Sequence, residues 1–148
     1  MAEDSTTRMR VDLSELKKEF KDAQRQIQLV NSEFKAATAG MAKWADDADG
    51  VSAKIEQLNG VLAAENVKLQ SLEDQYKLVA QEQGENSRGA QELLIRINNQ
   101  KAAIERTQAA LAQYGDRLEN LQSESQKAAA ATEQLQNKIS DQQTELDS

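Results

Sequence analysis

The sequence predicts an all-α protein, an elongated helical hairpin or coiled coil of about three long helices. Proline is absent from the 148 residues, and Ala, Gln, Glu, Leu and Lys dominate, a composition typical of long helices. Aromatic residues make up 3%, too few to fill a thick globular core. Apolar residues recur at alternating steps of three and four, the heptad spacing of helices that pack against other helices.

The first predicted helix covers residues 13–44. Residues 1–12 are polar and lack periodicity, which predicts a flexible N-terminal arm. Asp12 and Glu15 have the spacing of a capping box and predict the helix start. Gly40 weakens the last turns. The predicted interface positions of this helix are Leu13, Leu16, Phe20, Ala23, Ile27, Val30, Phe34, Ala37, Met41 and Trp44.

An acidic turn over residues 45–50 separates this helix from a second one over 51–83, which Asp49 can cap. The dipeptide Asn59-Gly60 is a turn signal, but the heptad register continues through it, so we expect one helix. Glu65 is the polar member of the stripe, and a polar core residue often sets register at some cost in stability. The whole stripe is Val51, Ile55, Leu58, Leu62, Glu65, Leu69, Leu72, Tyr76 and Val79.

A turn over residues 84–87 precedes a third helix over 88–122, predicted to run antiparallel to the second. Gly84 suits a helix end, and Asn86 or Ser87 suits an N-cap. The first positions of its predicted stripe are Ala90, Leu94, Ile97, Lys101, Ile104 and Leu111, of which only Lys101 is polar. A change of register after Leu111 predicts a stammer or stutter, and the new stripe is Leu111, Tyr114, Leu118, Leu121, Ser125, Ala128, Thr132, Leu135, Ile139 and Leu146.

Residues 123–148 predict a weaker helical tail, because small and polar residues occupy its stripe. The pattern stops without a cap or breaker, which is typical of a piece cut from a longer chain. Whether residues 13–44 pack on the other two helices or on another copy of the chain is open at this point. The same heptads are also compatible with an extended parallel bundle.

Composition argues against several functions. Without cysteine or histidine, the chain has no thiolate chemistry and lacks the commonest general base and metal ligand. Carboxylates on helix faces have no water-excluding pocket to shift their pKa values, so we expect no enzyme, no cofactor and no small-molecule substrate. The net charge of −7 gives no attraction to nucleic acids or anionic membranes. We expect no specific nucleic acid, and no membrane for this segment.

Two local features admit a second interpretation. Asp47, Asp49 and Glu56 have the spacing of part of a calcium loop around Gly50, but Ala45 stands where an aspartate is needed. A solvated turn with a helix cap is therefore favoured. Trp44 continues the apolar stripe, which favours packing at a helix end over a docking site for a partner.

The stretch FKAATAGMAKWADDADG, residues 34–50, resembles the N-terminal region of tail tape measure proteins from siphophages and prophages of Gram-positive bacteria. The heptad runs on either side of the Gly-Glu-Asn-Ser turn resemble the long helical region of the same family. The resemblance covers roughly residues 11–120. It rests on the overall composition, the heptad pattern and a few short stretches of sequence. The family has no catalytic residues in this region that could be assigned to positions of this chain.

The resemblance implies a structural protein that acts as a helical ruler inside the tail tube. It also implies the tail tube protein and tail assembly chaperones as partners, besides self-association through the heptads. The expected location is the virion tail, and the bacterial host cytoplasm during assembly. The alternative is a generic coiled-coil scaffold or adaptor of a bacterial or cytoskeletal assembly.

Overall fold

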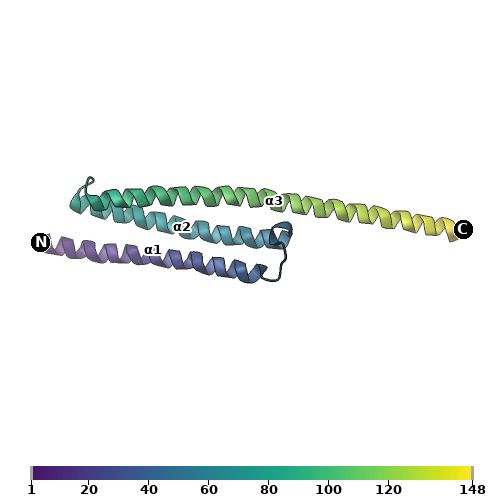
Figure 1. Cartoon of the computed structure of the whole chain (residues 1–148), viewed down its shortest axis with the longest axis horizontal. Helices are drawn as coiled ribbons and strands as arrows, with labels where there is room; N and C mark the ends of the chain where they lie inside the picture. Colours follow the sequence, from purple (N-terminus) through teal and green to yellow (C-terminus); the bar gives the residue numbers. More distant parts are fainter. Residues whose placement is uncertain (1, 148) are drawn as a thin grey trace.

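The computed structural model describes the backbone of residues 2–147 and the side chains of residues 7–146. Three long α-helices and one short 3₁₀ helix follow one another: α1 (Ala2–Thr38), η1 (Trp44–Asp46), α2 (Ala48–Gln83) and α3 (Arg88–Asp147). No strand occurs in residues 2–147, and the predicted all-α class with three long helices is confirmed. The helices lie side by side in alternating directions, with α2 against both neighbours, and α3 extends well beyond them (Figure 1).

Helix α1 differs from its predicted bounds at both ends. It begins at Ala2, where we expected a flexible arm over residues 1–12, because nothing in residues 2–12 breaks a helix. It ends at Thr38, before the expected 44, and the Met41 N–H donates to the Thr38 carbonyl at 3.0 Å in the turn around Gly40. The heptad pattern of the sequence continues through this turn, but the helix ends before it.

The start of α2 depends on Asp47 rather than on the predicted Asp49. Asp47 Oδ1 accepts a hydrogen bond from the Asp49 N–H at 2.8 Å, and the helix begins at Ala48. The helix then passes through Asn59-Gly60 without a break, as expected. Gly60 serves close packing: a Cβ atom there would lie 2.9 Å from Val30 Cγ1 of α1.

The turn between α2 and α3 matches the predicted chemistry. Gly84 has a φ of 98°, a left-handed conformation that suits glycine, and its N–H donates to the Ala80 carbonyl at 2.9 Å. Ser87 is the N-cap of α3, because its Oγ accepts from the Ala90 N–H at 3.2 Å. Residues within the turn itself therefore specify this reversal of the chain.

Helix α3 is continuous, and the predicted change of register after Leu111 is wrong. Leu94 is 39% exposed and Lys101 is also exposed, whereas Leu93 and Gln100 are buried. The covered positions keep one alternation of three and four throughout. We call them the α3 seam: Ala90, Leu93, Ile97, Gln100, Ile104, Thr107, Leu111, Tyr114, Leu118 and Leu121.

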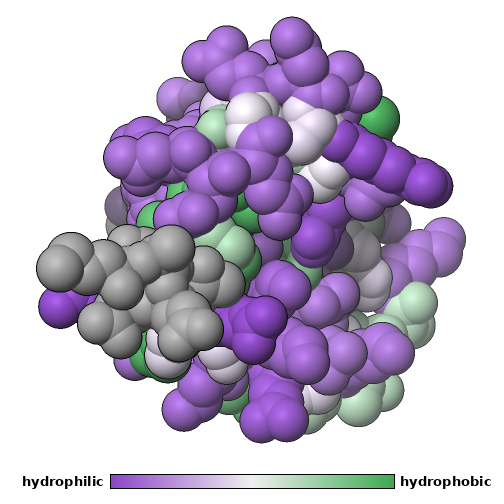
Figure 2. Space-filling view, turned by 90° about the vertical axis from the view of Figure 1, so that its left-hand side faces the viewer, coloured by the Kyte–Doolittle hydropathy of each residue, from purple (hydrophilic) through white to green (hydrophobic). Residues whose placement is uncertain are grey.

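The best-covered core lies near the α2–α3 turn. Its buried members come from α2 and α3: Leu72, Val79, Ala90, Leu93 and Ile97. Phe20 of α1 packs against this core, with Lys68 Nζ of α2 at 4.9 Å and Arg96 Cζ of α3 at 5.0 Å from its ring centroid. Seen end-on from this side, the outside of the molecule is largely hydrophilic (Figure 2). Most of the apolar side chains in this part of the molecule thus lie between the helices.

Candidate functional site

The predicted interface residues are nearly all withdrawn from solvent. Among the large apolar residues of the predicted stripes up to Leu121, Val51, Leu72, Val79, Ile97 and Ile104 are buried, and Leu94 is exposed. The others are half-buried: Leu13, Leu16, Phe20, Ile27, Val30, Phe34, Met41, Trp44, Ile55, Leu58, Leu62, Leu69, Tyr76, Leu111, Leu118 and Leu121. Ala37 and Lys101 of these stripes are exposed as well, and Ala23 is buried. Met41 and Trp44 follow the end of α1, so they do not extend its helical stripe.

A buried polar layer joins α2 to α3. The Thr107 hydroxyl donates to Glu65 Oε1 at 2.5 Å, and Gln100 Nε2 donates to the Glu65 backbone carbonyl at 3.2 Å. All three residues are buried. A buried polar group without a hydrogen-bond partner lowers the stability of a protein. This layer therefore favours the alignment of α2 and α3 in which all of its hydrogen bonds form. Gln100 and Thr107 were missed from the sequence because polar residues look like surface until their partner is known.

A second polar layer joins α1 to α2. The Ser71 hydroxyl donates to the Leu16 carbonyl at 2.5 Å, and Gln75 Nε2 donates to Ser71 Oγ at 3.1 Å. Ser71 and Gln75 are each 1% exposed. They lie off the predicted stripe of α2, on the face that meets α1. A helix between two neighbours has two buried faces, and heptad spacing alone indicates one.

Trp44 brings three helices together at the α1–α2 turn. Its ring meets Phe34 edge-on with 5.0 Å between centroids, and it meets Tyr114 of α3 at 5.8 Å. Lys54 Nζ of α2 lies 4.8 Å from the Phe34 ring centroid and 5.8 Å from that of Trp44. Burial lowers the pKa of the Lys54 ammonium, because partial desolvation disfavours its charged form. Trp44 is half-buried within the chain, which agrees with the favoured packing interpretation.

Arg117 of α3 holds the same turn from outside. Its Nη2 lies 2.6 Å from Asp46 Oδ1, and its Nε donates to the Ala45 carbonyl at 3.0 Å. Asp46 and Asp47 are thus engaged in an ion pair and a helix cap. Among the residues that the structure describes, no three acidic side chains converge as a metal site would need.

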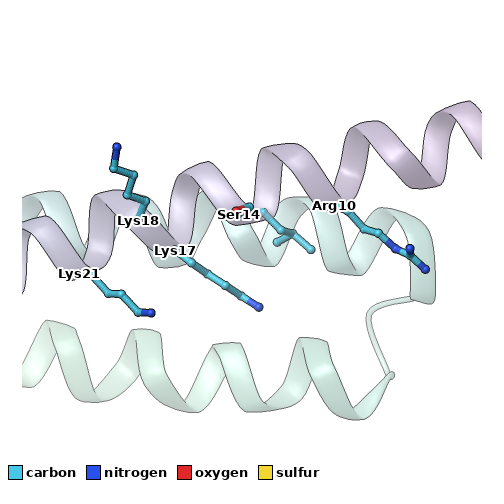
Figure 3. Close-up of a pocket in the computed structure, with 6 residues that line it drawn as sticks. Arg10, Ser14, Lys17, Lys18 and Lys21 are labelled. Carbon is cyan, nitrogen blue, oxygen red and sulfur yellow. The ribbon is translucent and has the colours of Figure 1, made fainter.

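A basic groove lies along the N-terminal half of α1. Arg10, Lys17, Lys18 and Lys21 line it together with Leu13 and Ser14. Lys17 and Lys21 extend toward the side on which α3 lies, whereas Lys18 points away (Figure 3). The four cations are exposed, and water screens such charges. The groove can attract anions only weakly.

No other helix packs against the C-terminal part of α3 within the described chain (Figure 1). The side chains of residues 122–146, which we call the uncovered segment, are all exposed, and the helix projects past both other helices (Figure 1). Leu135 is 60% and Ile139 56% exposed. The segment is helical to Asp147, which agrees with the helical tail predicted over 123–148, of which Ser148 lies outside the described residues. No break separates this tail from the rest of α3.

Comparison of the chain with family models, with curated protein sequences and with solved structures gives no match. None of the helices described combines the length and hydropathy needed to cross a membrane.

Proposed function

We propose that this chain is a structural segment of a phage tail tape measure protein, a helical ruler inside the tail tube without a catalytic role. The main observation in support of this proposal is the great length of the helices. Helix α3 alone has 60 residues, or about 90 Å at about 1.5 Å per residue. A helix converts residue number into distance linearly, which is what a ruler requires, and the resemblance over residues 11–120 supplies the biological setting.

The proposed partners are the tail tube protein, the tail assembly chaperones and other copies of the chain. In this proposal the three helices form an antiparallel helical hairpin with coiled-coil packing before assembly. The uncovered apolar positions of α3 need a cover, because exposed apolar stripes favour association. The proposed location is the host cytoplasm during assembly and then the virion tail.

A coiled-coil scaffold or adaptor is the second candidate, and one observation favours it. In the folded-back arrangement, the polar layers around Glu65 and Ser71 make hydrogen bonds from one helix to another. Unfolding the helices into an extended ruler breaks these bonds. A protein that keeps this arrangement would use the uncovered segment as an arm that holds a partner.

The two candidates are separated by tail length in the phage or prophage that encodes the chain. An in-frame deletion of residues 51–120 removes about 105 Å of straight helix at about 1.5 Å per residue. If the segment is part of the ruler, electron microscopy will show tails uniformly shorter by about that length. Gly115→Ala in the same gene is the control, since it leaves the residue number unchanged.

Tails of unaltered length after the deletion would exclude the ruler and favour the adaptor. Complete loss of tails would call for a second pair of variants, with three heptads inserted or removed after residue 122. Because no other helix packs against this part of α3 (Figure 1), its length can change without disturbing the packed helices. The ruler predicts a change of about 32 Å in opposite directions for the two variants.

A further inference from the structure

The uncovered segment continues the α3 seam without a change of phase. Beyond Leu121 the same alternation of three and four falls on Ser125, Ala128, Thr132, Leu135 and Ile139. The seam therefore presents one continuous face, of which α1, α2 and the turn between them cover the first part only. A face that packs against helices along half of its length is suited to pack against a helix along the rest.

We propose that the uncovered segments of two copies of this chain pair in antiparallel orientation, centred near Ala130. Antiparallel pairs place each a position of a heptad opposite a d position of the other helix. In this register Leu121 faces Ile139 of the second copy, and Leu135 faces Ser125 of the second copy. Ala128 and Thr132 face each other twice around the centre. Two layers thus pair Leu with Ile, two pair Leu with Ser, and the two central layers pair Ala with Thr, so the helices can approach most closely at the centre.

Charge selects this register. The heptad positions that flank the core carry Glu124 and Lys138, and the register brings Glu124 of each copy beside Lys138 of the other. Sliding by one heptad in one direction brings Glu124 beside Glu145 of the second copy. Sliding in the other direction brings Lys138 beside Arg117. Like charges at flanking positions oppose association, and opposite charges set orientation and partner.

The centre of the pairing is lined by alanine. Ala129 and Ala131 flank the core there, and each lies beside its own counterpart from the second copy. Small side chains at the contact allow a short distance between helix axes. The pairing stops near Leu121, because Leu118 and Tyr114 are already covered and Arg117 is held by Asp46. The interface is short, so we expect a reversible dimer.

This inference deepens the self-association in the proposed function, but it holds equally for a ruler and for an adaptor. Its test is independent of tail length, so either idea can fail alone. The chain has no cysteine, and two single-cysteine variants report orientation directly. Ala128→Cys and Thr132→Cys chains are mixed in a glutathione redox buffer, and the disulfide-linked species are separated by mass.

Antiparallel pairing will give mainly the mixed dimer between Cys at 128 and Cys at 132. Parallel pairing in register will give the two same-site dimers and would overturn the proposal. Crosslinking no higher than that of Ala130→Cys would also overturn it. Residue 130 lies at the same level on the outer face of the helix, so it is a matched control for random collision.

Charge variants give a second readout by analytical ultracentrifugation of the full chain. Lys138→Glu turns two attractive pairs into two repulsive ones and will weaken dimerisation roughly tenfold. Adding Glu124→Lys to it restores opposite charges and will restore the dimer. Lys127→Glu, on the outer face, is the control with equal change in charge. If Lys127→Glu and Lys138→Glu have the same effect, the proposed register is wrong.

Discussion

Single side chains decide how closely the helices of this protein approach. Gly50 is buried under the α1–α2 turn, and a Cβ atom there would lie 2.3 Å from the Trp44 carbonyl oxygen and 2.8 Å from the Trp44 Cα. These are backbone atoms, which cannot move aside as the end of a flexible side chain can. Glycine is needed at this position for space, although alanine is the better helix former.

Gly50→Ala will therefore destabilise the protein by about 2 kcal/mol, because overpacking outweighs the gain in helix propensity. Urea denaturation followed by far-UV circular dichroism measures the change. Gly115→Ala is the matched control, since nothing lies within 4 Å of its Cβ position. That variant will be more stable than the original by about 0.5–1 kcal/mol. Equal effects of both substitutions would contradict the proposed steric role of Gly50.

The polar layer between α2 and α3 is also a matter of single residues. Thr107→Val removes the hydroxyl that donates to Glu65 Oε1 and leaves a buried carboxylate without that donor. We expect a loss of about 1–3 kcal/mol in unfolding free energy. Thr107→Ser keeps the hydroxyl and will lose less. The double variant Glu65→Leu with Thr107→Val will recover stability, because removing both polar partners avoids the unpaired group.

These variants are measured together in one denaturant series. A Thr107→Val protein as stable as Thr107→Ser would show that the hydroxyl contributes nothing to the layer. A double variant less stable than Thr107→Val would show that the Glu65 side chain makes stabilising contacts other than that with Thr107, because Glu65→Leu leaves the backbone carbonyl that accepts from Gln100 in place.

At the scale of elements, α3 has two parts that differ in what covers them. The part up to Leu121 contributes buried and half-buried side chains, and the uncovered segment contributes none. Helical stability in proteins comes mostly from packing of an amphipathic face. The two parts of one continuous helix should therefore contribute very differently to the stability of the molecule.

Truncation after residue 121 will leave the unfolding midpoint of the remaining chain unchanged when it is followed by the fluorescence of Trp44. Truncation after residue 110 also removes Tyr114, which contacts Trp44, and Arg117, which binds Asp46. We expect this shorter chain to lose several kcal/mol, since it exposes the junction. A lower midpoint for the chain truncated after residue 121 would contradict the independence of the uncovered segment.

At the scale of the whole molecule, α2 couples the other two helices. It packs against both α1 and α3, and Phe20 and Trp44 extend the contacts of α1 and of the α1–α2 turn to α3. Helices that share one core unfold together, whereas an uncovered helix frays independently. The molecule should thus behave as one cooperative unit with a separately melting arm.

On heating dilute protein, far-UV circular dichroism will begin to fall before the fluorescence of Trp44 changes. In the chain truncated after residue 121 the two signals will share one transition, because the arm is gone. Coincident transitions in the full chain at low concentration would contradict this description. At high concentration the proposed pairing of arms predicts that the early loss of ellipticity moves to higher temperature.

Local chemistry made much of this fold predictable. Helix formation depends on the absence of proline and on the heptad spacing, which are properties of short stretches of sequence. Gly84 and Ser87 likewise affect only the backbone within a few residues of themselves. These features specify helices, and they specify one of the reversals closely. The other reversal was predicted near its true place, but the helix end was set by the turn at Gly40 and the cap by Asp47. Neighbouring acidic residues offered competing caps.

By itself, the sequence determined that this protein consists of long helices with apolar stripes, since propensity and periodicity need no partner. Only the tertiary structure decided which α3 residues form its seam. Gln100 and Thr107 became core positions through their bonds to Glu65, and Leu94 was left outside. It also decided that Ser71 and Gln75 lie on a second buried face of α2. The physical reason is that a polar residue can be buried only where another segment satisfies its hydrogen bonds.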